Sequence, residues 1–486
     1  MRTLPLLALA TLALASCKVG PDYVRPDAET PPAFKEAEGW EPAKPADTTS
    51  RGSWWSVYND PLLDSLEQQV AISNQNLRAS EAAFREARAV VHETEATLFP
   101  VVTGTGTAQR SGTGAGANFG TSSGGVVHRA GDQFTLGASA SWEIDLWGKI
   151  RRQIESNVAS AQASAADLAN AELSAQALLA ADYLQLRIED QLKKILDDNV
   201  DQFQISLKIT QNKYRSGVSA RSDVASAQAL LDGTRAQSIA VGVQRAALEH
   251  AIAVLIGKPP AEFSIAPDLA ELHVPEIPVV VPSILLERRP DIAAAERSIQ
   301  SSNALVGVAI AAYYPTVSLS GSYGFSSTQL GTLLQGANSI WAVGGQVAQT
   351  LFDFGQRTAQ VEAARAFYDE SVATYRQTVL TAFQQVEDEL AALRILQQED
   401  EVQRSAVKSA QEAVQLFINQ YKAGTVDYTS VTTAQTTALS DQETQINILA
   451  GRLAASVALI EALGGGWDAG QLPNDEQLDE GRRFFP

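Results

Sequence analysis

The feature that most constrains this chain is a pair of long stretches without glycine or proline. Residues 149–216 and 356–423 are each 68 residues long and contain neither residue type. Because glycine and proline are the usual helix breakers, each stretch can form one helix, roughly 100 Å long at about 1.5 Å per residue. Such helices are about three times longer than a bilayer's apolar core is thick, and these are too polar for lipid, so we expect them to cross water.

Apolar residues recur at every third or fourth position along both stretches. This spacing predicts coiled-coil-like packing against neighbouring helices, and frequent alanines permit close approach. Examples from the two stretches are Ile154, Val158, Leu179, Leu186, Leu196, Phe203, Leu207, Val361, Tyr375, Val386, Leu393, Val407, Val414 and Tyr421.

The two halves of the chain repeat each other. The segment YRSGVSARSDVASAQ at 214–228 matches YKAGTVDYTSVTTAQ at 421–435, at an offset of 207 residues. Upstream the offset becomes 215, so the length difference lies between Pro100 and Gly148, in a Gly/Ser/Thr-rich loop. Two copies of about 210 residues indicate a duplication, because solenoid repeats have far shorter periods.

Alternating apolar and polar residues predict β-strands between the helices. The alternation is clear in FTLGASASWEIDLWG (134–148) and PTVSLSGSYGF (315–325), and weaker in the partner segments 100–108 and 340–352. Alternation over about ten residues is typical of a transmembrane strand, apolar toward lipid and polar toward the bore. It also fits a half-buried strand of a soluble sheet, although the long helices and the start of the chain favour the membrane.

Two strands per repeat make four per chain, and four strands cannot close into a barrel. An open sheet edge cannot exist in lipid. Two chains would give eight strands, with an interior filled by side chains, whereas three would give twelve and leave a water-filled bore. We therefore expect a homotrimeric tube, with a 12-stranded transmembrane β-barrel continuous with a long α-helical barrel.

The start of the chain predicts a lipoprotein signal peptide over residues 1–16. Arg2 precedes a short apolar core, and small residues lead to Cys17, the only cysteine. The sequence LASC resembles the lipobox of bacterial lipoproteins, in which the cysteine is acylated and becomes the new N-terminus. Lys18 follows it, which suggests the outer rather than the inner membrane. A buried or incidental thiol is the alternative.

Composition argues against several other classes of protein. A net charge of −19 disfavours nucleic acid, and one cysteine excludes a disulfide framework. No run reaches the 18 or more apolar residues of a spanning helix. The four histidines are scattered, and there is no nucleophile elbow, phosphate loop or zincin pattern. We expect no enzyme activity, no metal site and no cofactor, apart from the covalent lipid on Cys17.

Five further motifs stand out along the chain: CKVGPDYVRP (17–26), SWWSVYNDPLLDSLEQQV (53–70), DLWGKIR (145–151), VPSILLERRPDIAAAE (281–296) and YYPTVSLSGSYG (313–324). Together they resemble the TolC-like outer-membrane efflux family, and most closely its OprM/NodT-type lipoproteins. The resemblance implies passive export of drugs or other small solutes. It also implies a periplasmic adaptor and an inner-membrane pump, often of the resistance–nodulation–division class, as partners.

These patterns predict the following organisation. An extended segment over 17–60 precedes a first repeat over 61–280, with a helix, a β-hairpin at about 100–147, a long helix at 149–215 and a return helix at 220–256. The second repeat, 281–466, has a helix, a hairpin at about 315–354, a long helix at 356–422 and a return helix at 428–463. Residues 467–486 form a C-terminal tail.

The resemblance also assigns functional residues at the turns between long and return helices. Gly217, Val218, Gly424 and Thr425 correspond to turns that contact the adaptor. The residues that correspond to the periplasmic gate are Asp223, Arg404, Lys408 and Glu412, with the aspartate pairing to a basic residue of a neighbouring subunit. The alternative is that these are ordinary solvated helix charges. Protein (type I) secretion on the same scaffold, or a structural coiled-coil lipoprotein, are the alternative functions.

Overall fold

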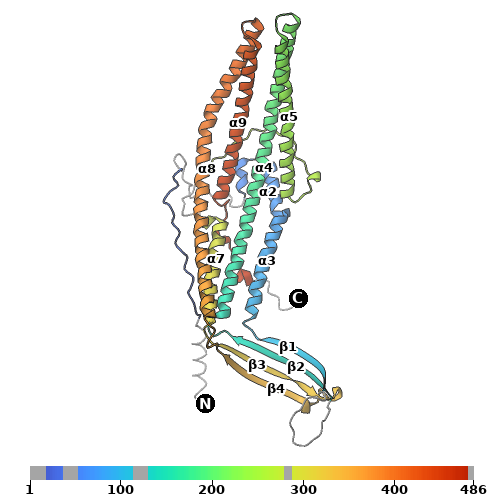
Figure 1. The fold of residues 1–486 in the computed structure, drawn as a ribbon, viewed down its shortest axis with the longest axis vertical. Helices are drawn as coiled ribbons and strands as arrows, with labels where there is room; N and C mark the ends of the chain where they lie inside the picture. The colour runs from blue at the N-terminus through green and yellow to red at the C-terminus, as the bar shows by residue number, and fades with distance from the viewer. Residues whose placement is uncertain (1–17, 37–52, 113–129, 278–286, 480–486) are drawn as a thin grey trace.

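The computed structural model describes residues 18–36, 53–112, 130–277 and 287–479. The molecule is elongated: helices run side by side over most of its length, and a four-stranded sheet lies at one end (Figure 1). We call the end with the helix turns distal and the end with the sheet proximal. The predicted arrangement of a β portion that continues into a long helical portion is confirmed for the single chain.

The sheet is antiparallel, and its strands follow the order of the chain. They are β1 (Val101–Gly112), β2 (Ala130–Ile144), β3 (Thr316–Ser327) and β4 (Ser339–Ala348). The register places apolar residues opposite one another on one face, as in the pairs Trp142↔Leu319 and Tyr323↔Trp341. Hydroxyl side chains pair on the other face, which confirms the predicted alternation. Strands β1 and β4 are the two edges of the sheet, and neither edge is paired with another strand of the described chain.

The two long helices are α4 (Lys149–Arg215) and α8 (Gln356–Ala423), almost as the breaker-free stretches predicted. Each begins after a glycine with positive φ, at 79° for Gly148 and 88° for Gly355. The return helices, α5 (Arg221–Leu255) and α9 (Tyr428–Ala462), begin and end within one residue of their predicted bounds.

The shorter proximal helices differ in one respect from the prediction. The single helix expected at the start of the first repeat is two helices, α2 (Pro61–Ser73) and α3 (Gln75–Ala96), with α7 (Pro290–Ala311) in the second repeat. The break is at Asn74, whose side chain accepts hydrogen bonds from the backbone N–H groups of Asn76 and Leu77. An asparagine that caps a helix start competes with helix continuation, which sequence periodicity does not reveal.

Apart from α2, which packs against α4, the longer helices form one layer with a fixed order. In the distal half α5 packs on α4, α4 on α9 and α9 on α8, so α5 and α8 lie at the two ends of the row. In the proximal half the order is α3, α4, α7 and α8. At every level, an element from the first half of the chain therefore lies at one edge and an element from the second half at the other.

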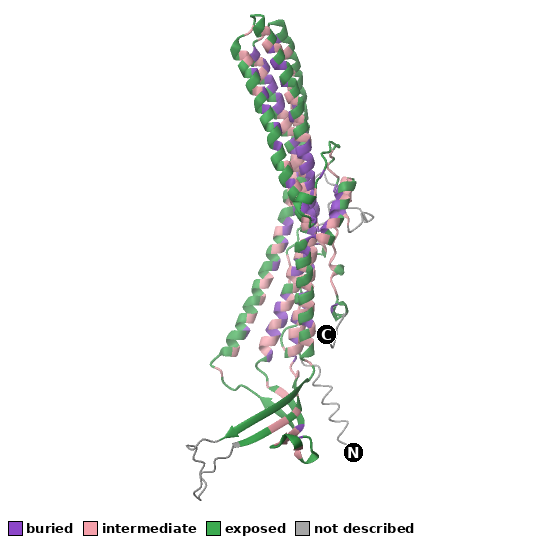
Figure 2. Cartoon of the chain, turned by 90° about the vertical axis from the view of Figure 1, so that its right-hand side faces the viewer, coloured by how far each residue is buried: buried purple, intermediate pink, exposed green. Residues whose placement is uncertain are grey.

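The main hydrophobic core lies at mid-length, where the short helix η1 (Trp54–Tyr58) and α2 pack against α4 (Figure 2). Aromatic and aliphatic residues fill it, including Trp54, Trp55, Leu63, Leu66, Val70, Leu179, Tyr183 and Leu186. A second, smaller cluster near the distal end joins α4 and α5 to the turn at Tyr421 and Tyr428.

Helices α5 and α9 are long and apolar enough to cross a membrane by length and composition alone. Neither helix contains an unbroken run of 18 apolar residues, so the sequence prediction did not include them. In the most apolar 18-residue segment of each helix, half of the residues are buried in α9, but only 28% are buried in α5. The outer face of α5 leaves Ile239, Val243 and Val254 exposed, as expected for a helix at the edge of a layer that another helix can cover.

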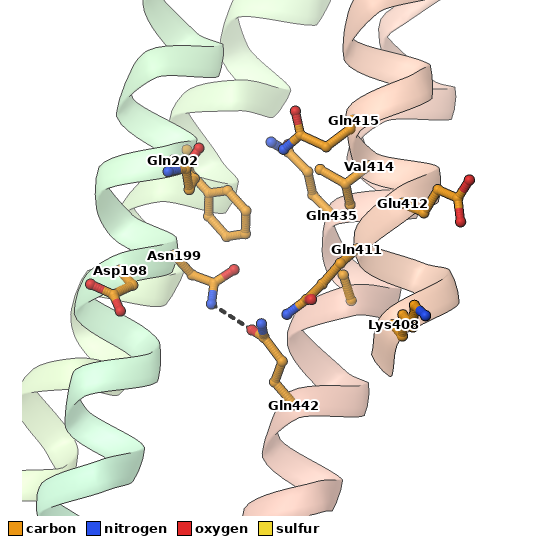
Figure 3. A pocket seen from close by; sticks show the side chains of 12 residues that line it. Asp198, Asn199, Gln202, Lys408, Gln411, Glu412, Val414, Gln415, Gln435 and Gln442 are labelled. Carbon is orange, nitrogen blue, oxygen red and sulfur yellow. Dashed lines mark hydrogen bonds between the residues drawn. The ribbon is translucent and has the colours of Figure 1, made fainter. Parts of the chain in front are cut away.

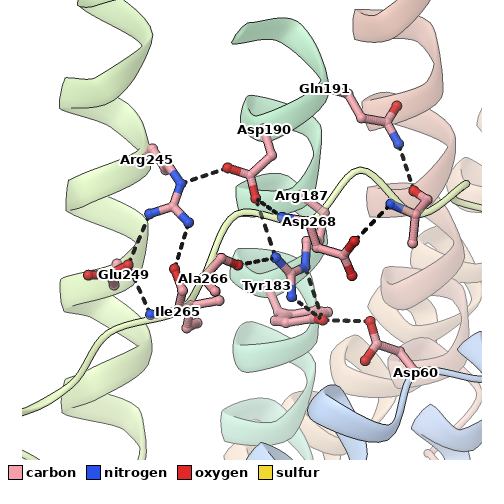
Figure 4. Close-up of polar contacts among 11 residues, drawn as sticks. Asp60, Tyr183, Arg187, Asp190, Gln191, Arg245, Glu249, Ile265, Ala266 and Asp268 are labelled. Carbon is pink, nitrogen blue, oxygen red and sulfur yellow. Dashed lines mark hydrogen bonds and ion pairs between the residues drawn. The ribbon is translucent and has the colours of Figure 1, made fainter. Parts of the chain in front are cut away.

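A polar cluster at mid-length fastens α5 to α4 (Figure 4). Asp190 accepts hydrogen bonds from Arg245 (Oδ1···Nε, 2.6 Å) and Arg187 (Oδ2···Nη1, 3.3 Å). Arg245 also donates to Glu249 and to the carbonyl of Ile265. We call Arg187, Asp190, Arg245 and Glu249 the mid-length cluster; it ties the connecting segment after α5 to the helical layer.

The N-terminal segment is held against the proximal helices by Arg152. This side chain is only 1% exposed, and its guanidinium donates to the carbonyls of Val19 and Gly20 and to Asp22. The N–H of Val19 donates in turn to the carbonyl of Trp147 at 3.1 Å. The residues just after position 17 are therefore fixed at the junction between the sheet and the helices.

Candidate functional site at the helix turns

The two distal turns use the same backbone motif. Gly217 and Gly424 have φ angles of 73° and 80°. The next residue in each turn donates its N–H five positions back, from Val218 to the Lys213 carbonyl and from Thr425 to the Gln420 carbonyl. This hydrogen-bond pattern with a left-handed residue ends a helix and favours glycine, which explains why the repeat keeps a glycine in both turns.

The two turns touch each other within one chain. The Lys213 ammonium lies 4.1 Å from the centre of the Tyr421 ring and donates to the Tyr421 carbonyl. The Ser219 hydroxyl is 3.2 Å from the Tyr421 hydroxyl. Tyr421 appears in the repeat, but nothing in the sequence indicated that Lys213 and Ser219 would reach it, because these contacts join residues about 200 positions apart.

The predicted gate aspartate has a local structural role. The Asp223 carboxylate accepts hydrogen bonds from the Ser219 hydroxyl (2.6 Å) and from the backbone N–H of Ala220 (3.3 Å), at the N-terminus of α5. Asp427 does the same for α9, accepting from the N–H and the hydroxyl of Ser430. These donors hold the pKa of Asp427 below its ordinary value.

The other three predicted gate residues lie lower on α8. Arg404 forms an ion pair with Asp400 (Nη2···Oδ2, 2.6 Å), and Arg452 binds the same carboxylate at 2.7 Å. Sequence reasoning missed Asp400, the carboxylate that Arg404 and Arg452 share. Lys408 and Glu412 lie one and two turns further on, at a cavity described below.

The structure does not bring Asp223 to either basic residue. Asp223 lies in the first turn of α5, whereas Lys408 lies 16 residues before the turn glycine Gly424. The two positions differ in height by roughly 20 Å at about 1.5 Å per residue. The predicted pairing is with a neighbouring subunit, so it stays a prediction.

A cavity of about 500 Å³ lies between α4 and the α8/α9 pair (Figure 3). Amide side chains dominate its lining: Asn199, Gln202, Gln411, Gln415, Gln435 and Gln442. Asn199 donates to Gln442 and Gln435 donates to Ser206, each at 2.8 Å, so the two helix pairs are joined here by neutral hydrogen bonds.

The remaining predictions concern covalent lipid and metal. Cys17 lies outside the described residues, and its neighbour Lys18 forms an ion pair with Glu155 at 3.3 Å, near the proximal end of α4. Across the ranges that the structure describes, no group of three or more His, Cys, Asp or Glu side chains is arranged to hold a metal ion.

Comparisons with known proteins agree with this architecture. The family model for outer membrane efflux proteins matches residues 66–258 and 281–465. The antibiotic efflux pump outer membrane protein ArpC of Pseudomonas putida is 29% identical over 463 residues, which cover 95% of each chain. The pyoverdine export outer membrane protein OpmQ of Pseudomonas aeruginosa is 30% identical, over 87% of this chain and 89% of that one.

Solved structures share the same fold. The outer-membrane channel OprN superimposes with a TM-score of 0.83 at 32% identity, covering 93% of this chain and all of that one. The open state of the MtrE outer membrane channel of Neisseria gonorrhoeae gives a TM-score of 0.82 at 25% identity, covering 93% and 99%.

Proposed function

Because this chain belongs to the outer membrane efflux protein family, we propose that it is the outer-membrane channel of a tripartite efflux system. It passively exports drugs or other small solutes, and it is a transport component rather than an enzyme. The observation that carries this proposal is the four-stranded sheet with one apolar face, continuous with helices of about 100 Å. In this arrangement the sheet spans the membrane, and the helices extend away from the membrane through water.

The open edges support assembly as a homotrimer. In the sheet, the proximal half and the distal half, the two edge elements differ. Elements β1, α3 and α5 lie at one edge, and β4 and α8 lie at the other. Such edges fit head to tail, and a repeated head-to-tail contact closes a ring of three when neighbouring chains are related by a rotation of one third of a turn. Exposed apolar residues on both helical edges, Ile239 and Val243 on α5 and Ile395 and Val402 on α8, fit this contact.

The two faces of the sheet fit lipid outside and water inside. The face with Trp142, Leu319 and Trp341 is suited to hydrocarbon. The opposite face pairs mainly hydroxyl and glycine residues, among them Ser139↔Ser322, and it carries Glu143 opposite Ser318 at the end of the strands near the helices. Beyond Glu143 this face carries little charge, so size would limit what passes through that part of the barrel.

Lipid attachment at Cys17 would add an anchor at the same level. Arg152 and Trp147 hold Val19 at the sheet–helix junction, two residues from Cys17. Acyl chains on that cysteine would therefore enter the bilayer beside the barrel, where each buried CH₂ contributes roughly 0.8 kcal/mol.

The distal turns are the parts farthest from the membrane-spanning sheet. We assign Gly217, Val218, Gly424 and Thr425 to contact with a periplasmic adaptor, which links the channel to an inner-membrane pump. The two turns that carry them share one backbone motif. Asp223 lies at this mouth and is the best placed of the proposed gate residues; Arg404, Lys408 and Glu412 would act further inside.

Two measurements test the proposal together. The purified protein should form detergent-resistant trimers and conduct ions in a planar bilayer, and a deletion strain should become more susceptible to drugs and dyes. A water-soluble monomer without pore activity would refute the channel. A conducting trimer whose deletion leaves susceptibility unchanged but blocks export of a protein would assign it to protein secretion instead.

A further inference from the structure

The distal turns carry the opposite charge to the rest of the molecule. The chain has a net charge of −19, yet residues 213–223 and 420–430 contain four bases and two acids, which leaves two positive charges. The bases are Lys213, Arg215, Arg221 and Lys422, and the acids are Asp223 and Asp427. Repeated in three chains, this would place a ring of positive charge at the end of an acidic tube.

Both acids are occupied by their own helices. Asp223 accepts from Ser219 and Ala220 at the start of α5, and Asp427 accepts from Ser430 at the start of α9. A carboxylate in such a position balances the positive end of the helix dipole. It therefore offsets helix charge rather than the neighbouring lysines and arginines.

The bases are not neutralised by ion pairs. Within the described ranges, none of the four forms an ion pair with a carboxylate. Arg215, Arg221 and Lys422 are exposed, whereas Lys213 is partly covered by the Tyr421 ring. Their charge is therefore available to a partner.

Helix stability accounts for three of the bases but not for Arg221. Lys213, Arg215 and Lys422 lie in the last turns of α4 and α8, where a cation is favoured by the helix dipole. Arg221 is the first residue of α5, where the same dipole disfavours a cation. An exposed arginine at an unfavourable end of a helix, without an ion pair, needs another reason to be there.

We propose that the distal turns form a basic docking surface for an acidic protein segment, with Arg221 as its main contact. This inference rests on the proposed function, because it specifies the chemistry of the periplasmic partner that meets these turns. The arginine fork suits carboxylates, and Val218, 70% exposed beside it, adds a small apolar contact. A protein segment fits such a mixed surface better than a lipid headgroup does.

The test uses the purified full-length protein and a fluorescent ten-residue glutamate peptide, followed by anisotropy at low and high salt. We expect binding that weakens with salt, and that Arg221→Glu weakens about fivefold at low salt. The matched control is Lys208→Glu, an equal charge change on an exposed residue of α4 two turns below the tip. It should change binding less than twofold.

Equal effects of the two variants, or no peptide binding, would overturn the inference. So would binding only to phosphatidylglycerol vesicles, which would identify the surface as a lipid contact. Pore conductance of the wild-type protein, measured in parallel, separates this outcome from failure of the proposed function. A conducting protein that does not bind the peptide refutes the docking surface alone.

Discussion

Replacing Asp190 with alanine tests whether the mid-length cluster holds the base of α5 in place. The Asp190 side chain is only 3% exposed and faces two guanidinium groups, Arg245 at 2.6 Å and Arg187 at 3.3 Å. It also accepts the backbone N–H of Asp268 at 3.2 Å, so it joins α4, α5 and the connecting segment. The substitution leaves both arginines with one carboxylate fewer in a largely buried site.

Removing one partner of a buried ion pair costs about 3–5 kcal/mol. If that cost falls on the local opening of the connecting segment, amide hydrogens there should exchange roughly 100- to 3000-fold faster, because each 1.4 kcal/mol is about tenfold. The N–H of Ile265 is the best reporter. It donates to Glu249 at 3.1 Å, a hydrogen bond that the substitution does not itself remove.

Hydrogen–deuterium exchange of the purified full-length protein measures this directly. The control is Asp198→Ala, which removes an exposed carboxylate that pairs with Lys194 four residues away on the same helix. Pairs of this kind contribute about 0.3–0.5 kcal/mol, so exchange at Ile265 should change less than threefold. Exchange in Asp190→Ala within threefold of wild type would refute the role of the cluster.

Four further predictions follow from single residues. Burial, and to a smaller extent the neighbouring Asp64 carboxylate, raises the pKa of Glu67 from 4.5 to about 9. Between these two pH values the folded state keeps a proton that the unfolded state has lost. The free energy of unfolding therefore falls as the pH rises from 4.5 to about 9. Glu67→Gln should stabilise the protein on the order of 2–3 kcal/mol at pH 7 and little at pH 4.5, measured by denaturant unfolding; equal gains at both pH values would contradict this. At Gly20, with φ 94°, an added Cβ would lie 2.4 Å from the backbone of α7. Gly20→Ala should therefore make the N-terminal segment more sensitive to added protease. Gly233→Ala is the control, because its Cβ would meet no atom within 4 Å, and it should leave protease sensitivity unchanged. Asp223→Ala should raise single-channel conductance in a planar bilayer, and unchanged conductance would remove it from the gate. Cys17→Ser should abolish labelling with radioactive palmitate, and a labelled variant would place the lipid elsewhere.

The sequence predicted the helical layer well because its signals are local. Gly148, Gly217, Gly355 and Gly424 mark the ends of the long helices, since each adopts a positive φ that other residues adopt at a cost. Most of the apolar residues named at helical spacing are buried, but α4 also buries polar side chains such as Arg152 and Asp190, which that spacing does not predict. The break at Asn74 was missed, because a polar residue inside a periodic stretch is compatible with either a continuous helix or a new start.

The candidate site was predicted less completely, and the reason is again physical. The sequence located both turns, but it could not distinguish a charge that caps a helix from one that faces a partner. Asp223 caps α5, and Arg404 is already paired to Asp400. Only the packing of helices fixes which charges meet.

By itself, the sequence determined the periodic features: the length of the helices, the alternating faces of the strands and the duplicated turns. Each depends on the geometry of one element, which a few neighbouring residues impose. The tertiary structure alone decided the contacts of Arg152 with Val19 and of Asp190 with Arg245. These partners are separated by 133 and 55 residues, so their hydrogen bonds exist only after distant segments have packed.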